Sequence, residues 1–227
     1  GILRSDLGML APGDVRNCVS ALAEVDPVMG ELLNFRFKDG SLKGHSLGNL
    51  FLAALNETSS SFDEAVKKFS HLAGVVGTVY PVTNESVTLS ALLEDGRLIE
   101  GESHIGVHHD GPKNGIVKLM VNPEKPKAVD GVIKALEKAD IIVLGPGSLY
   151  TSIIPNLLVD GVVDAIKKSN AVKIYVCNIM SQAGETENYT VSDHLAAIER
   201  HSYEGIADIV IANNAIIPES LRIKYAS

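Results

Sequence analysis

Glycine and hydroxyl residues follow one short apolar run of the chain, and together they could bind a ligand. The run at 141–144 is followed by Gly-Pro-Gly-Ser at 145–148, and more hydroxyl side chains come directly after it. Glycine lets the backbone turn sharply and a ligand approach closely, and polar turns at strand ends are frequent binding positions in α/β sheets. A plain strand-to-helix turn with hydroxyl caps is the alternative. The candidate binding residues are Gly145, Gly147, Ser148, Tyr150 and Thr151.

A second polar stretch, at 178–189, follows another predicted strand at 173–177. Asn213 and Asn214 follow a third predicted strand, at 207–212. Because the carboxyl ends of parallel strands meet at one edge of a sheet, we expect these stretches to line one crevice with the turn at 145–151. The second stretch adds the candidate binding residues Asn178, Glu185, Thr186 and Tyr189.

The N-terminal part holds a charged group at the start of a predicted helix, which runs from Asp14 as N-cap to about Val25. Arg16 and Asn17 fall in its first turn, where the helix dipole disfavours a cation. Asp14, Arg16 and Asn17 could therefore hold a charged ligand. A cap beside a solvated arginine explains the same spacing.

The segment Gly-His-Ser-Leu-Gly-Asn at 44–49 precedes an apolar, buried helix that ends near Leu55. Free amide groups at a buried helix start can bind an anion, and a histidine there could exchange a proton near neutral pH. A closely packed helix is the alternative. The candidate residues are His45, Ser46 and Asn49.

Four residues, His104, His108, His109 and Asp110, form a patch that could bind a metal. They lie among glycines without regular spacing, so we interpret them as solvated loop residues and predict no metal site. The two cysteines are far apart, which favours a reducing compartment over a disulfide framework.

Composition excludes several classes of protein. The 227 residues are 45% hydrophobic and 21% charged, which is ordinary for a globular chain. The formal net charge of −8, without a basic block, argues against nucleic acid and anionic membranes as main partners. The sequence contains no apolar run of membrane-spanning length and no visible signal peptide, so we expect a cytoplasmic protein.

The order of predicted elements indicates an α/β fold, a Rossmann-like parallel sheet with helices on both faces. An Asp-Gly turn at 95–96 predicts an antiparallel hairpin, which we place in a small inserted subdomain at 75–121 of a single 1–227 domain. We expect the β-branched run at 141–144 to form a strand whose two faces are both covered by other parts of the protein. Helices are predicted at 61–74, 128–138, 157–168, 190–201 and 218–225, and further strands at 75–82, 87–93, 97–99 and 116–121.

These motifs resemble those of the bacterial gluconeogenesis factor family, whose superfamily includes the phospholactate transferases of deazaflavin-coenzyme biosynthesis. The resemblance implies a Rossmann-related domain whose Gly-rich first strand turn, of Gly-Gly-Gly-Thr-Gly type, precedes Gly1. It also implies that Tyr189 contacts the ligand, as does a basic residue near the end, Lys224 or Arg222. The resemblance rests on the stretches 12–17, 44–49, 145–152, 155–159, 178–180, 184–186, 189 and 193–194.

The resemblance implies a cytosolic regulator of carbon metabolism and cell shape that binds a nucleotide sugar such as UDP-N-acetylglucosamine. The alternative is a 2-phospho-L-lactate transferase that moves a phospholactyl group from a nucleotide diphosphate to a deazaflavin acceptor, with Mg²⁺ on the phosphates. Its catalytic groups would be Asp14, His45 and His194, and Asp14, Asn17 or Asp193 could hold the metal. We favour the regulator, because a shared fold does not transfer chemistry. A homodimer and unknown protein partners are compatible with either function.

Overall fold

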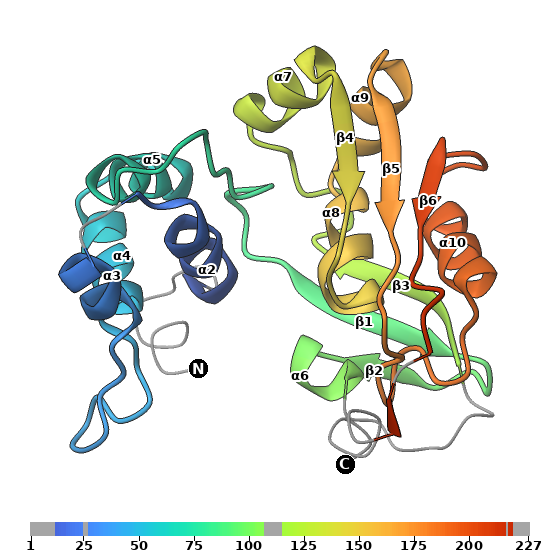
Figure 1. The fold of residues 1–227 in the computed structure, drawn as a ribbon, viewed down its shortest axis with the longest axis horizontal. Helices are drawn as coiled ribbons and strands as arrows, with labels where there is room; N and C mark the ends of the chain where they lie inside the picture. Colours follow the sequence, from blue (N-terminus) through green and yellow to red (C-terminus); the bar gives the residue numbers. More distant parts are fainter. Residues whose placement is uncertain (1–11, 25–26, 107–114, 217, 220–227) are drawn as a thin grey trace. The chain divides into compact units, whose positions relative to one another are not determined.

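A computed structural model describes residues 12–24, 27–106, 115–216 and 218–219 (Figure 1). Contacts within the chain divide it into two compact units. Unit 1 comprises Gly1–Thr88, Val121–Lys138 and Leu158–Ser169, and unit 2 comprises Leu89–Met120, Ala139–Leu157 and Asn170–Ser227. Helices, a parallel sheet and an antiparallel hairpin confirm the predicted α/β class. The predicted inserted subdomain stays a prediction.

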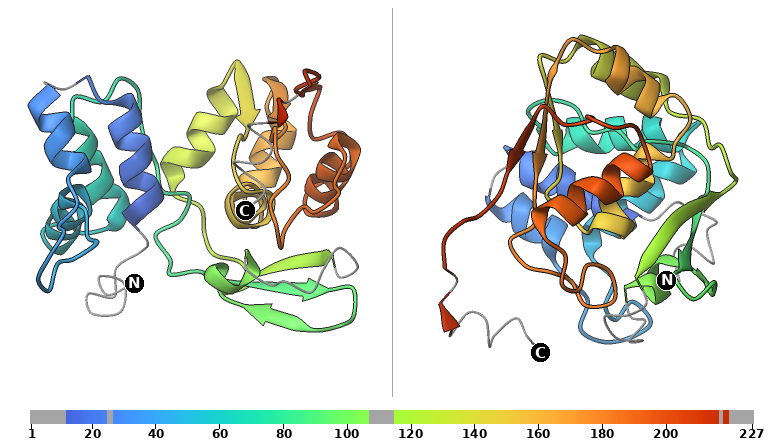
Figure 2. Two further views of the ribbon diagram at one scale, coloured as in Figure 1. Left: turned by 60° about the horizontal axis from the view of Figure 1, so that its bottom comes forward. Right: turned by 90° about the vertical axis from the view of Figure 1, so that its right-hand side faces the viewer.

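Unit 1 is built mainly from helices: α2 (Pro12–Leu22), α3 (Pro27–Asn34), α4 (Leu47–Glu57) and α5 (Phe62–Leu72), which Figure 2 shows grouped together. Their apolar faces meet in one core. Helices α7 (Asp130–Lys138) and α9 (Val162–Lys168) pack against each other in the same unit. The largest side chains of the helical core are Leu33, Leu52, Phe62 and Phe69.

Helix α5 has well-defined ends. The hydroxyl of Ser61 accepts a hydrogen bond from the Glu64 N–H at 3.4 Å, as an N-cap does. The Glu64 carboxylate forms no capping box with Ser61, because it accepts the N–H and hydroxyl of Ser60 instead. After α5 the chain turns at Gly74, whose φ of +56° suits glycine and confirms the predicted helix end.

Unit 2 contains the predicted hairpin, with β1 (Thr88–Leu93) antiparallel to β2 (Leu98–Glu100). Gly96 in its turn has a φ of +86°, a conformation that glycine adopts without strain. Strand β3 (Ile116–Asn122) joins them in the order β2-β1-β3, and the short helix α6 (Glu102–Ile105) follows β2.

The second sheet of unit 2 consists of β4 (Ile141–Leu144), β5 (Val172–Val176) and β6 (Ile209–Ile211), all parallel and in that order. After β4 the chain forms a π-helical turn η1 (Leu149–Ile153) that continues into α8 (Ile154–Leu157). Helix α10 (Val191–Arg200) follows the loop after β5. Two predicted strand-end turns are therefore neighbours, because β4 and β5 pair directly.

Strand β4 is buried on one face only, so the expectation that both of its faces are covered is wrong. Ile142 and Leu144 are buried, whereas Ile141 and Val143 are more than half exposed. The register places Val143 beside Ile174 and Ile174 beside Ile209, so their side chains share the exposed face. The apolar run alone could not reveal this difference, because both faces carry aliphatic residues.

Three predicted elements differ in the structure. Residues 75–82 form no strand: Val75 makes only an isolated bridge to Ala23, and the chain turns at Gly77 with a φ of +98°. The predicted helix 157–168 is interrupted at Gly161, whose φ is +86°. Helix α2 begins at Pro12, so Asp14 lies in the first turn and is not its N-cap.

Two further predictions concern residues outside the described ranges, namely most of the histidine patch and the last helix, 218–225. Within the described ranges, no helix has both the length and the apolarity needed to cross a membrane.

Candidate functional site

The turn after β4 and the loop after β5 are joined by side-chain hydrogen bonds in unit 2. The Gly147 N–H donates to Asn178 Oδ1 at 3.3 Å, and Asn178 Nδ2 donates back to the Gly147 carbonyl at 2.8 Å. The Ser148 hydroxyl donates to Gln182 Oε1 at 2.8 Å. The two strand ends that the sequence predicted to be adjacent are therefore adjacent, and their polar groups face each other.

Glu185 is the centre of this network, and only 4% of its surface is exposed. Its carboxylate accepts the Tyr150 N–H at 3.0 Å, the Thr151 hydroxyl at 3.1 Å and Gln182 Nε2 at 3.0 Å. Burial raises the pKa of Glu185 above its ordinary value, because a carboxylate loses hydration inside the protein. The Tyr150 and Thr151 donors hold the loop against the first turn of η1, and the Gln182 donor lies within the loop itself, so the carboxylate is used in shaping the turn.

Tyr150 connects the same turn to the rest of unit 2. Its hydroxyl donates to the Ile116 carbonyl at 3.1 Å and lies 2.9 Å from the Tyr189 hydroxyl. Arg200 Nη2 donates to the Tyr150 hydroxyl at 3.4 Å. Burial is the main cause that raises the pKa of Tyr150 above the usual tyrosine range. Tyr150 therefore acts as a neutral structural group.

Thr186 and His194 are also enclosed. The Thr186 hydroxyl accepts the Gln182 N–H at 2.9 Å. His194 is 3% exposed, and its Nδ1 donates to the Thr190 carbonyl at 2.8 Å. Its ring packs edge-on against Tyr189 at 5.4 Å, and its Nε2 is buried without a partner. For His194 to act as a base, this ring would first have to become accessible to substrate.

Asp193 forms a capping box at the start of α10. Its carboxylate accepts the Thr190 N–H and hydroxyl, both at 2.7 Å, and the Thr190 hydroxyl accepts the Asp193 N–H at 3.3 Å. These hydrogen bonds lower the pKa of Asp193.

Unit 1 holds a second polar cluster around Arg16, which is only 6% exposed. Its Nη1 donates to Asn34 Oδ1 at 2.8 Å, its Nη2 contacts Asn17 Oδ1, and its Nε has no partner. Both partners are neutral amides, and Arg16 forms no ion pair with a described carboxylate. Burial and the nearby charge of Arg36 lower the pKa of Arg16. The cluster therefore contains a buried cation without a counter-charge.

The first turn of α4 holds Arg16 in place. Ser46 caps α4 by accepting the Asn49 N–H at 3.3 Å. A Cβ at Gly48 would lie 2.6 Å from the Leu33 carbonyl oxygen and 2.9 Å from Arg16 Cδ, so only glycine allows this approach. Asn49 Oδ1 is buried without a partner, next to the residue that contacts Arg16. His45 is half-buried beside this turn, and Asp14 is exposed.

The cluster of unit 1 can do chemistry that the network of unit 2 cannot. A buried guanidinium without a carboxylate favours an anionic ligand, and an unpaired amide oxygen favours a hydroxyl or N–H donor. Arg16 and Asn49 could thus bind the phosphate and a hydroxyl of one molecule.

The two aspartates that were considered as metal ligands are not arranged to bind a metal ion. Asp14 is exposed and the Asp193 carboxylate serves as a cap. Across the described ranges, no group of three His, Cys, Asp or Glu residues could hold a metal ion. The predicted contacts of Lys224 or Arg222 lie outside the described residues.

The profile of the 2-phospho-L-lactate transferase CofD family matches residues 1–227. The chain belongs to this family. Among curated relatives, the gluconeogenesis factor of Bacillus subtilis is 42% identical over 99% of this chain and 70% of its own length. The match to the predicted family, with its phospholactate transferase superfamily, is confirmed.

A relative from Clostridium acetobutylicum is 48% identical over 99% of this chain, and the chain spans about half (50%) of that relative's length. A Bacillus halodurans protein of known crystal structure is 43% identical to this chain in sequence. The two structures superpose with a TM-score of 0.95. That match covers 99% of this chain and 71% of the crystallised one. The α/β fold described here is therefore the fold of this relative.

Sequence reasoning missed several residues that build these clusters in the structure. Gln182 and Arg200 complete the network of unit 2, and Asn34 binds Arg16 in unit 1. Gln182 lies inside the predicted polar stretch, so its position was a usable signal. Arg200 and Asn34 lie in helices with no motif, and only the tertiary structure reveals their contacts.

Proposed function

We propose that this chain binds a nucleotide sugar of the UDP-N-acetylglucosamine kind and acts as a regulator of carbon metabolism and cell shape. The observation that carries the proposal is the buried Arg16 guanidinium, whose partners among the described residues are neutral amides. A diphosphate would supply the missing negative charge. Relatives in the same family that carry the name gluconeogenesis factor support the regulatory role.

Arginine suits this task better than lysine would. Its planar guanidinium stays charged and presents several donors to one phosphate group. Arg16 keeps its Nε free for such a contact, while Asn17 and Asn34 orient the other two nitrogens. Asn49 Oδ1 offers an acceptor for a sugar hydroxyl or a base N–H.

The test is calorimetric titration of the complete protein with UDP-N-acetylglucosamine. We expect saturable binding in the wild type and a loss of at least about tenfold in affinity for Arg16→Met, because one charge-assisted contact is removed. Lys134→Met, which removes an exposed lysine from α7 of the same unit, is the matched control and should bind normally. Equal affinity in wild type and Arg16→Met would refute this site.

The regulatory part of the proposal can be tested in cells. The chain should restore carbon-source-dependent growth and rod shape to a Bacillus subtilis strain that lacks its own gluconeogenesis factor. Arg16→Met should fail to restore growth although the variant accumulates normally. Full rescue by this variant would separate ligand binding from regulation.

A second candidate function is phospholactyl transfer, which the description of the matching family favours. The test is incubation of the purified protein with a phospholactyl-nucleotide diphosphate, a deazaflavin alcohol and Mg²⁺, with product detected by mass spectrometry. Turnover that is abolished by Arg16→Met would establish the transferase. Absence of product, together with binding of UDP-N-acetylglucosamine, would favour the regulator.

A further inference from the structure

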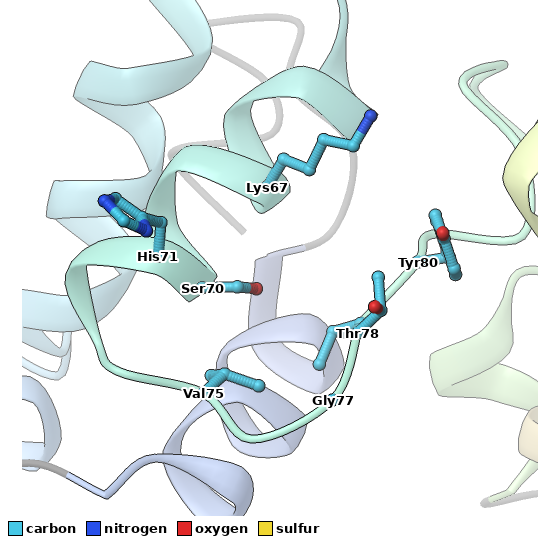
Figure 3. Close-up of a pocket in the computed structure, with 8 residues that line it drawn as sticks. Lys67, Ser70, His71, Val75, Gly77, Thr78 and Tyr80 are labelled. Atoms are coloured by element: carbon cyan, nitrogen blue, oxygen red, sulfur yellow. The ribbon is translucent and has the colours of Figure 1, made fainter.

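A cavity of about 290 Å³ lies in unit 1, between α5 and the segment 75–80 that follows it (Figure 3). It involves none of the residues assigned above to ligand binding. Its size is at the low end of ligand pockets, which range over roughly 300–1,000 Å³. A nucleotide sugar would not fit, but a phosphate group with a short carbon chain would.

Ser70 places an unpaired hydroxyl at this cavity. The residue is only 9% exposed, and its Oγ is buried without a hydrogen-bond partner. Figure 3 shows the Ser70 side chain directed from α5 toward the segment that carries Thr78. A buried polar group without a partner costs free energy unless a ligand or water satisfies it. The site is therefore built to accept one more polar group.

The charge around Ser70 favours an anion. Lys67 lies one turn earlier on the same side of α5, and it forms no ion pair with any described residue. No carboxylate lines the cavity, although the whole chain carries a net charge of −8. In Figure 3 the Lys67 side chain leaves α5 on the side of the segment 75–80 with its amine end directed away from Ser70, and the His71 ring also points away from Ser70.

The facing segment adds further donors. Thr78 and Tyr80 contribute hydroxyl groups, and the N–H groups of Gly77 and Thr78 donate to no acceptor in the described part of the chain. Gly77 has a φ of +98°, and a Cβ there would meet nothing within 4 Å, so the backbone is open to a ligand. The ring of Tyr80 lies against Gly131 of α7, where a Cβ would come within 2.4 Å of it. This contact fixes one wall of the cavity.

We propose that this cavity is a second binding site, which takes a small phosphate monoester or inorganic phosphate. The phosphate oxygens accept from the Ser70 hydroxyl, the Thr78 hydroxyl and the free N–H groups, and the Lys67 ammonium balances their charge. The aliphatic Val75 and Val79 contact the carbon part of an ester. The site is independent of the proposed nucleotide-sugar site at Arg16.

The test uses glycerol 3-phosphate, inorganic phosphate and neutral glycerol as probes on the complete protein. Amide resonances of Gly77 and Thr78 are followed by NMR during each titration. We expect saturable shifts with the phosphate-containing probes and none with glycerol. A preference of about tenfold for the ester assigns the site to esters, and equal affinity assigns it to the free anion.

Variants separate this site from non-specific charge effects. Ser70→Ala and Thr78→Val each remove one hydroxyl, and Lys67→Ala removes the ammonium, so each should weaken binding by about tenfold. Ser70→Ala should fold as well as wild type, because it removes an unpaired buried group. Ser86→Ala, at an exposed serine of the same unit, is the control and should bind normally.

Three outcomes would overturn the proposal: no saturable binding of either phosphate probe, binding of glycerol with equal affinity, or binding unchanged in Ser70→Ala and Lys67→Ala. The result is independent of the proposed function. Arg16→Met should leave phosphate binding here unchanged, and Ser70→Ala should leave binding of UDP-N-acetylglucosamine unchanged.

Discussion

The polar cluster around Glu185 in unit 2 and the polar cluster around Arg16 in unit 1 each centre on one buried ionisable side chain. They differ in how many of the hydrogen-bonding groups of that side chain have partners. Glu185 is buried and receives three hydrogen bonds from Tyr150, Thr151 and Gln182. Arg16 is equally buried, yet it forms no ion pair with a carboxylate in the described part of the chain and keeps an unpaired Nε. The first arrangement stabilises a loop, and the second leaves capacity for a ligand.

This difference shows that a residue within a sequence motif can stabilise the conformation of a loop instead of contacting a ligand. The Gly-Glu-Thr motif at 184–186 follows the family pattern, but its carboxylate and hydroxyl are used within the protein. Protein groups that are already paired offer little to a ligand, because binding would first break existing hydrogen bonds. Unpaired buried groups are therefore better indicators of a binding site than polar residues in general.

The largest effect should come from Glu185→Ala, because it leaves two buried donors of the η1 turn and one of Gln182 without an acceptor. We expect a loss of about 3–5 kcal/mol in the free energy of unfolding, measured by urea denaturation. Glu204→Ala, at an exposed glutamate of the same unit, should change it by less than about 0.5 kcal/mol. If Glu185→Ala lowers the free energy of unfolding by no more than Glu204→Ala does, the network does not stabilise the fold.

Gly48→Ala should have the next largest effect. Its Cβ would meet the Leu33 carbonyl oxygen at 2.6 Å, so α3 and α4 must separate and Arg16 must move. We expect a loss of about 1–3 kcal/mol, measured by thermal denaturation followed by circular dichroism. Gly13→Ala is the matched control, since its Cβ would meet nothing within 4 Å and α2 should be stabilised slightly. Similar effects of both substitutions would contradict the close contact.

His201 should make unit 2 sensitive to acid. Its Nδ1 donates to the Ala197 carbonyl at 2.7 Å and its Nε2 accepts the Leu119 N–H at 2.8 Å, so the ring is neutral in the fold. Burial lowers the pKa of His201 below its ordinary value of 6.5.

The unfolded chain therefore binds this proton more readily than the folded chain, and stability should fall as pH drops below about 6.5. The slope from this residue should be at most about 1.4 kcal/mol per pH unit. Urea midpoints at pH 7.5 and 5.5 should differ less in His201→Gln than in wild type. An equal difference in both proteins would show that another group is responsible.

The smallest effect on stability is expected for Arg16→Met, although its effect on ligand binding should be large. Removing a buried charge without a counter-ion relieves its desolvation cost, and methionine keeps much of the apolar contact with Gly48. We expect a free energy of unfolding within about 1 kcal/mol of wild type, or higher, in urea denaturation. A loss above about 3 kcal/mol would place Arg16 with Glu185 as a structural residue.

Elements with strong local patterns were predicted well from sequence. The hairpin at Asp95-Gly96, the strand 141–144 and helix 190–201 all occur with small shifts at their ends. The strand predicted at 75–82 is wrong: Val75 and Val79 pack on the helical core, Val76 is exposed, and no strand in the described part of the chain pairs with the segment. β-propensity of this kind reflects the partner more than the chain itself.

The candidate sites, too, could be predicted only where they depend on local sequence or on strand pairing. The adjacency of the polar turns after β4 and β5 could be predicted, because it follows from the parallel pairing of their strands. The sequence could not predict that Glu185 and Thr186 form their hydrogen bonds within the protein, since those bonds depend on distances between side chains. The free hydroxyl of Ser70 was equally hidden, because a serine inside an amphipathic helix has no motif that marks it.

Four properties could be predicted from the amino-acid sequence alone: the α/β class, the hairpin, the positions of the strand-end turns and the family. These properties depend on local periodicity, on turn residues and on motifs that persist along one stretch of chain. The folded structure was needed to show which face of β4 is exposed, which polar groups are already paired, and which remain free. Those properties depend on neighbours that are distant in sequence, and burial gives each missing partner its energetic weight.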